Sequence, residues 1–365
     1  MVTKNTELCT GCGVCAAVCP KNCLKIELND DGFYIPYLIN DSCINCGICD
    51  KVCPKEATGS MSKPISLSAV VAKDEEILKT TSSGGLCYEI AKKCLGEGKK
   101  VCGCVYDYES HRAVHKVIET EEDLEATKGS KYFQSYTSEA FKEIFDGNEW
   151  VVFGTPCQIA AIDKAATIKK NRDKLILVDF FCHGTPSMHL WDKYVKENGG
   201  NDISKIDFRS KEFGWHSWSL KFSYKNGKTK SDSADNMFYK FFFSNLCLNN
   251  SCYNCDYKSY NSSADIRTGD FWGTKYREDR KGVSCCVVMT EAGAEIIERL
   301  KETCIVADAL SEEVLEEQMV KSPVLHKERS KVMKALKSDR SLEKIYNTTV
   351  FTFRLKGKLK SMMGR

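Results

Sequence analysis

The sequence from Cys9 to Pro20 reads Cys-Thr-Gly-Cys-Gly-Val-Cys-Ala-Ala-Val-Cys-Pro, and it returns from Cys43 to Pro54 as Cys-Ile-Asn-Cys-Gly-Ile-Cys-Asp-Lys-Val-Cys-Pro. Each cysteine and the proline of the first copy recur 34 residues later. Such a repeat is typical of a duplicated structural unit. In each copy the pattern predicts a loop with three cysteines that leads into a short helix ending at Cys-Pro. Between the copies, Lys25–Leu28 and Phe33–Leu38 alternate like strands around a turn at 29–32.

The spacing C-x2-C-x2-C-x3-C-P is that of bacterial ferredoxins with two [4Fe–4S] clusters. In this pattern a cubane takes three thiolates from one loop and the fourth from the other copy. We therefore assign one cluster to Cys9, Cys12, Cys15 and Cys53, and the other to Cys43, Cys46, Cys49 and Cys19. Glycines at 11, 13 and 47 would let backbone N–H groups approach the sulfides. Zinc would favour two separate knuckles with longer spacers, and Cys23 is interpreted as a small core residue outside the pattern.

The 21 cysteines in 365 residues allow two explanations, a secreted disulfide scaffold or metal sites in a reducing compartment. Disulfide-dense scaffolds are usually short and secreted. This chain is long, groups its cysteines as C-x-x-C and has no apolar leader before Cys9, so metal ligation in the cytoplasm is the prediction. It has no apolar run long enough to span a membrane. Its net charge of +3 is small, so no nucleic-acid partner is predicted.

The chain divides into a module at 1–60, a linker at 61–67, a second domain at 68–340 and a basic tail at 341–365. In the second domain, Val101–Tyr106, Trp150–Phe153 and Leu175–Phe181 read as buried strands. Leu86–Leu95, Gln158–Ala166 and Met188–Glu197 read as helices, and 218–230 as a hairpin. Strands followed by helices predict an α/β sheet.

Two segments of this domain share one pattern, a buried strand, a cysteine near its end, Gly-Thr-Pro and a helix. They are 152–159 with Cys157 and 181–187 with Cys182. Proline suits a first helical position, and ligands bind at the carboxyl ends of strands in such sheets. With Cys252 and Cys255, the two cysteines make four thiolates, enough for a third [4Fe–4S] cluster. Buried structural cysteines and an empty C-x-x-C pair explain the pattern equally well, and Cys247 is a possible substitute ligand.

The second region resembles the coenzyme F420 hydrogenase/dehydrogenase β-subunit family over about residues 70–330. The resemblance rests on SSGG at 82–85, KGSKYFQS at 128–135, GTPCQIAA at 154–161, CHGTPS at 182–187, FRSKEFGWHSW at 208–218, SCYNC at 251–255, ADIRTGDFWG at 264–273 and GVS at 282–284. It implies FAD, a [4Fe–4S] cluster on Cys157, Cys182, Cys252 and Cys255, and electron transfer between the two. An N-terminal two-cluster ferredoxin fused to this domain recurs among the relatives.

The residues assigned to the flavin follow from this resemblance, since no G-x-G-x-x-G fingerprint is present. The N–H groups of a helix after the SSGG run would suit a pyrophosphate, although a serine N-cap alone explains such a sequence. For the segment 128–132 the alternative is a basic surface turn. For the GDFWG segment that contains Asp270 the alternative is a core position. The assigned residues are Ser82, Ser83, Gly84, Gly85, Lys128, Ser130, Lys131, Tyr132, Gly154, Thr155 and Asp270.

His183 is the candidate catalytic residue because it follows Cys182 directly. A histidine there is placed to give a proton to the flavin or to a substrate. A hydrogen bond to the cluster or a structural role is an equally good interpretation.

We thus expect an α+β and α/β protein, with an N-terminal 2[4Fe–4S] ferredoxin-type module before a larger mixed α/β flavin-binding domain. The expected function is electron transfer between the clusters and FAD, and between FAD and a small organic substrate or an F420-like deazaflavin, with a redox partner such as ferredoxin. A non-catalytic electron-transfer subunit of a larger complex is the alternative, and an iron–sulfur protein with a decayed flavin site is a third. Residues 321–365 hold 13 Lys/Arg against 3 Asp/Glu. This charge predicts a solvated helix and tail, or a surface that docks to an acidic partner such as a ferredoxin, to an anionic substrate or to a membrane surface.

Overall fold

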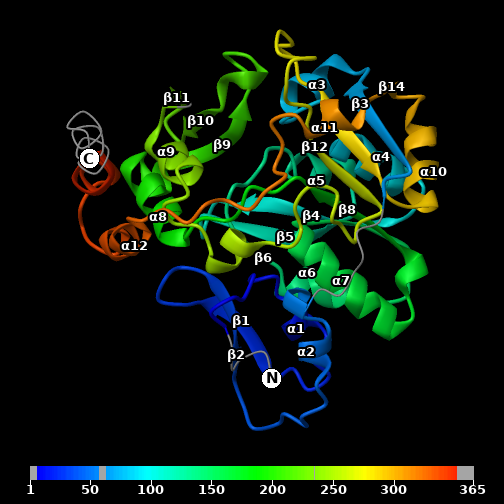
Figure 1. The fold of residues 1–365 in the computed structure, drawn as a ribbon, viewed down its shortest axis with the longest axis horizontal. Coiled ribbons are helices and arrows are strands. Elements are labelled where there is room, and N and C mark those ends of the chain that lie inside the picture. The colour runs from blue at the N-terminus through cyan, green and yellow to red at the C-terminus, as the bar shows by residue number, and fades with distance from the viewer. Residues whose placement is uncertain (1–5, 57–62, 234, 352–365) are drawn as a thin grey trace, which may run out of the picture.

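The computed structural model describes residues 6–56, 63–233 and 235–351. Figure 1 shows a small N-terminal unit (blue) below a large sheet with its helices, and a second group of helices and strands beside that sheet. Most of the predicted basic tail, 352–365, and residues 57–62 of the region around the linker lie outside the described residues.

The N-terminal unit has the duplicated architecture that the repeat predicts. Its strands β1 (Leu24–Leu28) and β2 (Tyr34–Leu38) pair antiparallel. The short helices α1 (Val14–Ala17) and α2 (Ile48–Lys51) each begin after a glycine in the left-handed region, with φ of 78° and 70°. A 3-10 turn, η2 (Pro54–Glu56), begins at the proline of the second Cys-Pro pair.

A mixed nine-stranded sheet forms the centre of the second domain, in the order β14-β3-β13-β12-β8-β7-β4-β5-β6. The four strands β12, β8, β7 and β4 run parallel, so their carboxyl ends meet at one edge. The strands are β3 (Ser66–Ala72), β4 (Lys100–Asp107), β5 (Arg112–Ile118), β6 (Ser135–Tyr136), β7 (Trp150–Phe153), β8 (Leu175–Phe180), β12 (Ile266–Asp270), β13 (Ser284–Val288) and β14 (Cys304–Asp308).

Helices cover both faces of this sheet, which explains why the central strands β7 and β8 are largely apolar. Val151 packs with α4 (Leu86–Gly96) and α10 (Glu291–Leu300) in one core. Its neighbour Val152 belongs to the core on the other face, with α6 (Ser138–Glu143) and α7 (Pro156–Lys169). The helices predicted to begin near residues 86, 158 and 188 are thus present.

A three-stranded sheet and a helical layer lie at the left of Figure 1. The strands are β9 (Ile203–Ser210), β10 (Ser219–Tyr224) and β11 (Thr229–Asp232), and β10 and β11 form the predicted hairpin. The helices of this part are α8 (Met188–Glu197), α9 (Met237–Phe243), α12 (Arg329–Leu336) and α13 (Leu342–Tyr346), followed by η7 (Asn347–Phe351). Shorter elements elsewhere are α3 (Glu75–Thr80), α5 (Glu121–Glu125), α11 (Ser311–Leu315), η3 (Arg172–Lys174), η4 (Gly200–Asp202), η5 (Trp215–Ser217) and η6 (Asn250–Asn254).

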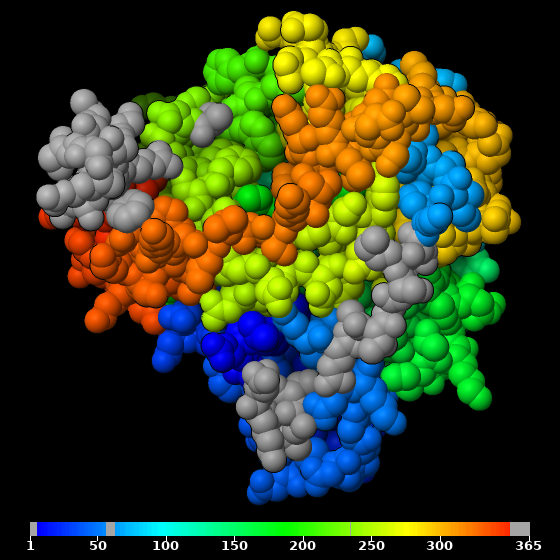
Figure 2. Space-filling model, viewed as in Figure 1, coloured from blue at the N-terminus to red at the C-terminus, as the bar shows by residue number. Residues whose placement is uncertain are grey.

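The N-terminal unit packs on the second domain through one continuous hydrophobic core. Val14, Ile26 and Val52 of the unit belong to the same buried cluster as Phe141 and Trp191 of the domain. The turn between β1 and β2 is held as well, because the N–H of Met188 donates to the carbonyl of Gly32 at 2.8 Å. Figure 2 shows this unit projecting from one end of the molecule. Among the helices of the described chain, none combines the length and the apolar character that crossing a bilayer requires.

Candidate functional site

Four thiols of the N-terminal unit lie within electrostatic reach of one another, at the end that faces the second domain. They belong to Cys9, Cys12, Cys15 and Cys53 and are called the inner set below. Burial raises the pKa of Cys9 to about 11 and raises the pKa of Cys12 and of Cys15 further. Buried thiols of this kind become ligands only when a metal centre offsets the cost of forming thiolates.

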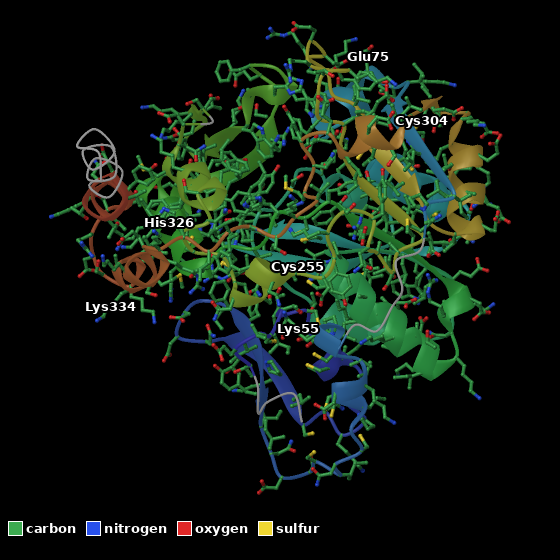
Figure 3. The ribbon with its side chains drawn as sticks, viewed as in Figure 1. Lys55, Glu75, Cys255, Cys304, His326 and Lys334 are labelled. Atoms are coloured by element: carbon green, nitrogen blue, oxygen red, sulfur yellow. The ribbon has the colours of Figure 1, made fainter. Side chains whose placement is uncertain are left out.

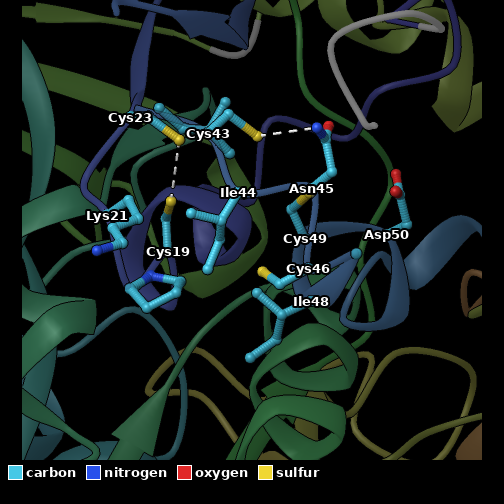
Figure 4. A pocket seen from close by; sticks show the side chains of 13 residues that line it. Cys19, Lys21, Cys23, Cys43, Ile44, Asn45, Cys46, Ile48, Cys49 and Asp50 are labelled. Carbon is cyan, nitrogen blue, oxygen red and sulfur yellow. Dashed lines mark hydrogen bonds between the residues drawn. The ribbon is translucent and has the colours of Figure 1, made fainter. Parts of the chain in front are cut away.

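A second group of thiols lines a cavity of about 110 Å³ at the far end of the unit (Figure 4). Cys19, Cys43, Cys46 and Cys49, the outer set, are joined there by Cys23. Cys23 is buried, as expected of a core residue, and its sulfur nevertheless faces the cavity (Figure 4). No three His, Cys, Asp or Glu side chains within 6–56, 63–233 and 235–351 form a site for a single metal ion.

The loop after β7 turns sharply into α7, as the Gly-Thr-Pro pattern predicts. Pro156 is the first residue of the helix, and Thr155 is its N-cap. The N–H of Thr155 donates to Oε1 of Gln158 at 2.9 Å, which completes a capping box. Cys157 is therefore fixed in the first helical turn at the carboxyl edge of the sheet.

The loop after β8 differs from this prediction, because Pro186 does not begin a helix. Ser187 caps α8, and Pro186 instead pairs with Leu248 in an isolated β-bridge. The N–H of Asn249 donates to the carbonyl of Thr185 at 2.9 Å, and the N–H of Thr185 lies 3.4 Å from the Cys252 sulfur. This pairing brings η6, with its C-x-x-C pair, beside the strand end that carries Cys182.

The two loops and η6 enclose a second cavity, of about 50 Å³. Its lining includes the third set of thiols, namely Cys157, Cys182, Cys252 and Cys255. Cys247 is fully buried in the hydrophobic core, and it is absent from this lining. Burial raises the pKa of Cys157 to about 12 and that of Cys182 further. The geometry therefore favours these four residues over Cys247 as a ligand set.

The inner set lies between the outer set and the third set. Cys15 is electrostatically coupled to Cys49 of the outer set, and Cys12 is coupled to Cys157 of the third. Lys55 of the N-terminal unit also lines the cavity of the third set, and Figure 3 shows it close to Cys255. The three sets thus follow one another from the tip of the N-terminal unit to the sheet edge.

Side chains of the second domain hold the inner loop in this position. Gln134 donates to the carbonyl of Thr10 at 3.0 Å, and Thr137 donates to the carbonyl of Cys12 at 3.0 Å. From the other side, the hydroxyl of Tyr257 donates to the carbonyl of Pro54 at 2.7 Å, and Lys164 donates to the carbonyl of Cys53 at 2.8 Å. The separation between the inner and third sets is therefore fixed by direct hydrogen bonds.

His183 lines the third cavity, but its ring is engaged with protein groups. Nε2 donates to Oδ1 of Asn245 at 2.7 Å, and the ring packs on Phe242 with centroids 4.8 Å apart. Burial lowers the pKa of His183, which keeps the ring neutral near pH 7. Lys258 donates to the carbonyls of Cys182 and His183. Lys258 thus brings a positive charge to the loop that carries Cys182, and His183 holds this loop.

Two of the segments assigned to the flavin meet at the N-terminus of α4. The N–H and hydroxyl of Ser130 each lie 3.0 Å from Oγ of Ser82. Lys128 donates to Oγ1 of Thr80 at 2.9 Å and pairs with Glu125 at 2.8 Å. Sequence positions about 50 residues apart therefore form one polar cluster at this edge of the sheet.

Three of the assigned residues are glycines, and Gly84 is required by packing. A Cβ on Gly84 would lie 2.2 Å from the carbonyl oxygen of Val70, and Gly85 has a φ of +88°. A Cβ on Gly154 would lie 3.2 Å from the Gln158 side chain. Lys131 is also used internally, since it donates to the carbonyls of Cys104, Thr127 and Lys128, and burial lowers its pKa to about 8.

Arg209 links Tyr132 and Asp270, and it is not among the residues predicted from the sequence. Its guanidinium donates to the Tyr132 hydroxyl and to Asp270, both at 3.2 Å, and lies 4.0 Å above the Trp218 ring. The indole of Trp272 stacks on Trp218 with centroids 5.4 Å apart. The only sequence signal was the position of Arg209 in the FRSKEFGWHSW motif.

Lys211 is a second residue that the sequence analysis missed. It follows Arg209 by two positions, and its ammonium donates to the carbonyls of Leu78 and Ser83, each at 2.6 Å. Burial lowers the pKa of Lys211 to about 8. Several hydrogen-bond donors that suit an anionic phosphate meet at this place. They belong to the open first turn of α4, where Cys87 is exposed, to the Ser82–Ser130 pair, and to Lys128 and Lys211.

Comparison with known sequences identifies the two parts of the chain. Residues 67–142 match the N-terminal part, and residues 147–313 the C-terminal part, of the coenzyme F420 hydrogenase/dehydrogenase beta subunit. Together these stretches make up more than half of the 365 residues. The chain belongs to this β-subunit family. Residues 8–57 match a 4Fe-4S dicluster domain, so this member of the family carries a ferredoxin-type module at its N-terminus.

The fold of the β-subunit domain agrees with a solved structure. A chain of the F420-reducing [NiFe] hydrogenase complex from Methanosarcina barkeri matches with a TM-score of 0.51 and 20% identity, over 68% of this chain and 83% of that one. At this identity the likeness establishes the fold. No curated protein matches the sequence. The family and the fold class expected from the sequence are confirmed.

Proposed function

We propose that this β-subunit family member is an FAD-dependent iron–sulfur oxidoreductase, which passes electrons between its ferredoxin-type clusters and FAD. One observation carries the proposal. The cavity lined by Cys157, Cys182, Cys252 and Cys255 also includes Gly11 and Lys55 of the ferredoxin-type module in its wall. A cluster bound there would lie between the module and the sheet edge at which the flavin is proposed to bind.

The proposed FAD site extends along the sheet edge from the third set to the N-terminus of α4. Strands β8, β12, β13 and β3 are consecutive neighbours, so the edge covers three strand spacings, about 14 Å. Asp270, at the end of β12, lies between the two ends of this path. Bound there, FAD would exchange electrons in pairs with a substrate and singly with a cluster.

The protein groups around this edge have separate roles. The open N-terminus of α4, with Ser82 and Ser130, would bind the pyrophosphate. Arg209 fixes Asp270 and the Tyr132 hydroxyl, and the stacked indoles of Trp218 and Trp272 lie over its guanidinium. His183 keeps the loop after Cys182 in place through Asn245.

The substrate is proposed to be a small organic molecule or a deazaflavin such as F420. The related Methanosarcina barkeri complex is an F420-reducing hydrogenase. Ferredoxin is the proposed one-electron partner, at the outer end of the module.

A non-catalytic electron-transfer subunit is the second candidate function. The segment 316–328 crosses one face of the molecule (orange in Figure 2) and lies against the C-x-x-C segment, where the N–H of Cys255 donates to Ser322 at 3.0 Å. Val324 and Leu325 on this segment are 81% and 57% exposed. Adjacent exposed apolar side chains favour contact with another subunit. Co-purification of a stoichiometric partner, without turnover by the isolated chain, would support this candidate.

Iron, sulfide and flavin content per chain, after anaerobic purification, tests the proposal. About twelve irons and one FAD are expected. Cys252→Ala should lose about four irons, whereas Cys247→Ala, a buried control in the same segment, should keep them. Lys211→Met should lower the FAD content and leave iron unchanged. About eight irons without flavin in the unmodified protein would overturn the proposal.

A further inference from the structure

The cavity at the outer end of the module holds one thiol more than a cubane requires. Its wall contains the four sulfurs of the outer set and that of Cys23. The Cys23 sulfur lies 3.4 Å from that of Cys19, and Figure 4 shows the two thiols side by side. Cys23 also lies within hydrogen-bonding reach of Cys43. The thiols of Cys19 and Cys23 therefore face the same part of the cavity.

Backbone structure places the fifth thiol independently of the ligand loops. Cys23 immediately precedes β1, and its carbonyl accepts the N–H of Ile39 at 3.0 Å, so the hairpin fixes it. Asn22 has a φ of +48°, and its N–H donates to the carbonyl of Cys19 at 3.1 Å. This turn folds the chain back so that residues four apart present their sulfurs to the same space.

The module's internal repeat shows that the fifth thiol belongs to one copy alone. Cys19 corresponds to Cys53, 34 residues later, and the position that corresponds to Cys23 is Ala57. The inner set therefore has no counterpart of Cys23 at this position. The copy with the extra thiol is the one at the exposed end, where Cys46 is exposed. Cys23 itself is 3% exposed, so it is shielded from reagents that reach its neighbours.

We infer that Cys23 is a reserve ligand of the outer cluster, able to replace Cys19. In the exchange, the iron–sulfur bond to Cys19 breaks and a bond to Cys23 forms. The proton that leaves the Cys23 thiol passes to the Cys19 thiolate, so neither charge nor oxidation state changes. The inference rests on the dicluster domain alone and does not require the flavin or the third cluster.

Iron and sulfide analysis of matched variants, with electron paramagnetic resonance of the reduced protein, tests this inference. Cys19→Ala should keep the iron content of the unmodified protein and show an altered signal for one cluster, because a different cysteine now completes its site. The double variant Cys19→Ala, Cys23→Ala should lose about four irons. Cys23→Ala alone should keep all of its iron.

The corresponding substitution in the other copy provides the control. Cys53→Ala should lose about four irons, because the sequence of this copy has Ala57 at the position that corresponds to Cys23. Cys19→Ser is the second variant, and it should retain iron in the same way as Cys19→Ala if the exchange occurs. Loss of about four irons from both Cys19 variants, with Cys23 intact, would overturn the inference. The iron and flavin content of the unmodified protein tests the proposed function separately.

Discussion

Three glycines of the cysteine loops show how one residue type serves different purposes in two copies of a motif. A Cβ on Gly11 would lie 2.4 Å from the Gln134 amide nitrogen, and a Cβ on Gly13 would overlap the Thr137 hydroxyl. A Cβ on Gly47 would meet nothing within 4 Å. From the sequence, all three are predicted to let backbone N–H groups approach the sulfides. The sequence does not reveal that two of them are also needed for contact with the second domain, because that contact depends on the tertiary fold.

His115 is a buried histidine whose neutral form the fold requires. Nε2 donates to the carbonyl of Phe153, at the end of β7, at 3.0 Å, whereas buried Nδ1 has no partner in the described part of the chain. Burial lowers the pKa of His115 from 6.5 to about 4. Below pH 6.5, His115 binds a proton in the unfolded chain but stays neutral in the folded protein. The free energy of unfolding therefore falls as the pH falls.

We predict that His115 contributes about 1 kcal/mol to the loss of stability between pH 8 and pH 6. Urea unfolding of the anaerobic protein at both pH values measures it. His115→Gln should lack this part of the loss, while His216→Gln, at an exposed position, should retain it. The same pH dependence in His115→Gln and the unmodified protein would contradict the assignment.

At the scale of elements, local and long-range patterns differed in what they could predict. The helix after β7 begins at Pro156 because capping is decided within a few residues, and the sequence contains all of them. The loop after β8 has the same Gly-Thr-Pro letters, yet its proline pairs with Leu248. Because Leu248 is more than 60 residues away from Pro186, the spacing of residues around Pro186 cannot predict this pairing.

Strand β9 explains why Arg209 and Lys211 were missed. Alternation along a strand usually separates a buried face from a solvated one. At the end of β9, consecutive residues Phe208, Arg209 and Ser210 are all buried, so the charged side chain lies inside against the expected period. Such a residue becomes visible only when its partners, Tyr132 and Asp270, are known.

An ion pair between two sheet strands anchors the segment that follows the third set of cysteines. Arg267 of β12 donates twice to Asp179 of β8, at 2.7 Å each, and both side chains are fully buried. A third donor of Arg267 binds the carbonyl of Ser259 at 2.6 Å, four residues after Cys255. The pair therefore connects sheet geometry to the position of the ligand segment.

We predict that Arg267→Met destabilises the protein by about 3–5 kcal/mol, because it leaves the Asp179 carboxylate buried without its partner. Adding Asp179→Leu should recover much of this loss, since no charge then remains buried. Thermal unfolding of both variants measures the effect. Equal destabilisation in the single and double variants would rule out an uncompensated charge as the cause. Both should hold less iron than the unmodified protein, because the Ser259 carbonyl has lost its donor.

On the scale of the whole molecule, the three thiol sets lie one after another between the tip of the module and the sheet edge. The outer set is at the exposed tip of the module, and the third set is at the sheet edge, with the inner set between them. The spacing of the cysteines predicts how the inner and outer thiols are grouped, and this grouping stays a prediction. It does not predict the order of the three thiol sets, which follows from the docking of the inner loop on Gln134, Thr137 and Tyr257.

We predict that Cys46→Ala removes the outer cluster, with about four irons, and with it the reduction of the remaining clusters by a protein donor. Cys46 is exposed, and its cavity opens at the tip where a donor protein has access. A small reductant such as dithionite should still reduce the inner centres. Stopped-flow absorbance with each reductant separates the two routes.

The control for this prediction is Cys94→Ala, which removes a buried thiol of α4 that lines neither cavity. It should behave as the unmodified protein with both reductants. Rapid reduction of Cys46→Ala by a donor protein would show that electrons enter elsewhere.

The shared core of the ferredoxin-type module and the β-subunit domain has a consequence for kinetics. A carrier domain on a free tether collects an electron at one place and delivers it at another, so its rate depends on diffusion of the domain. Here Val14, Ile26 and Val52 are packed among side chains of the second domain, and the inner loop is hydrogen-bonded to it. Passage of electrons inside this protein should therefore be insensitive to solvent viscosity, and only the encounter with an external donor should slow in a viscous medium.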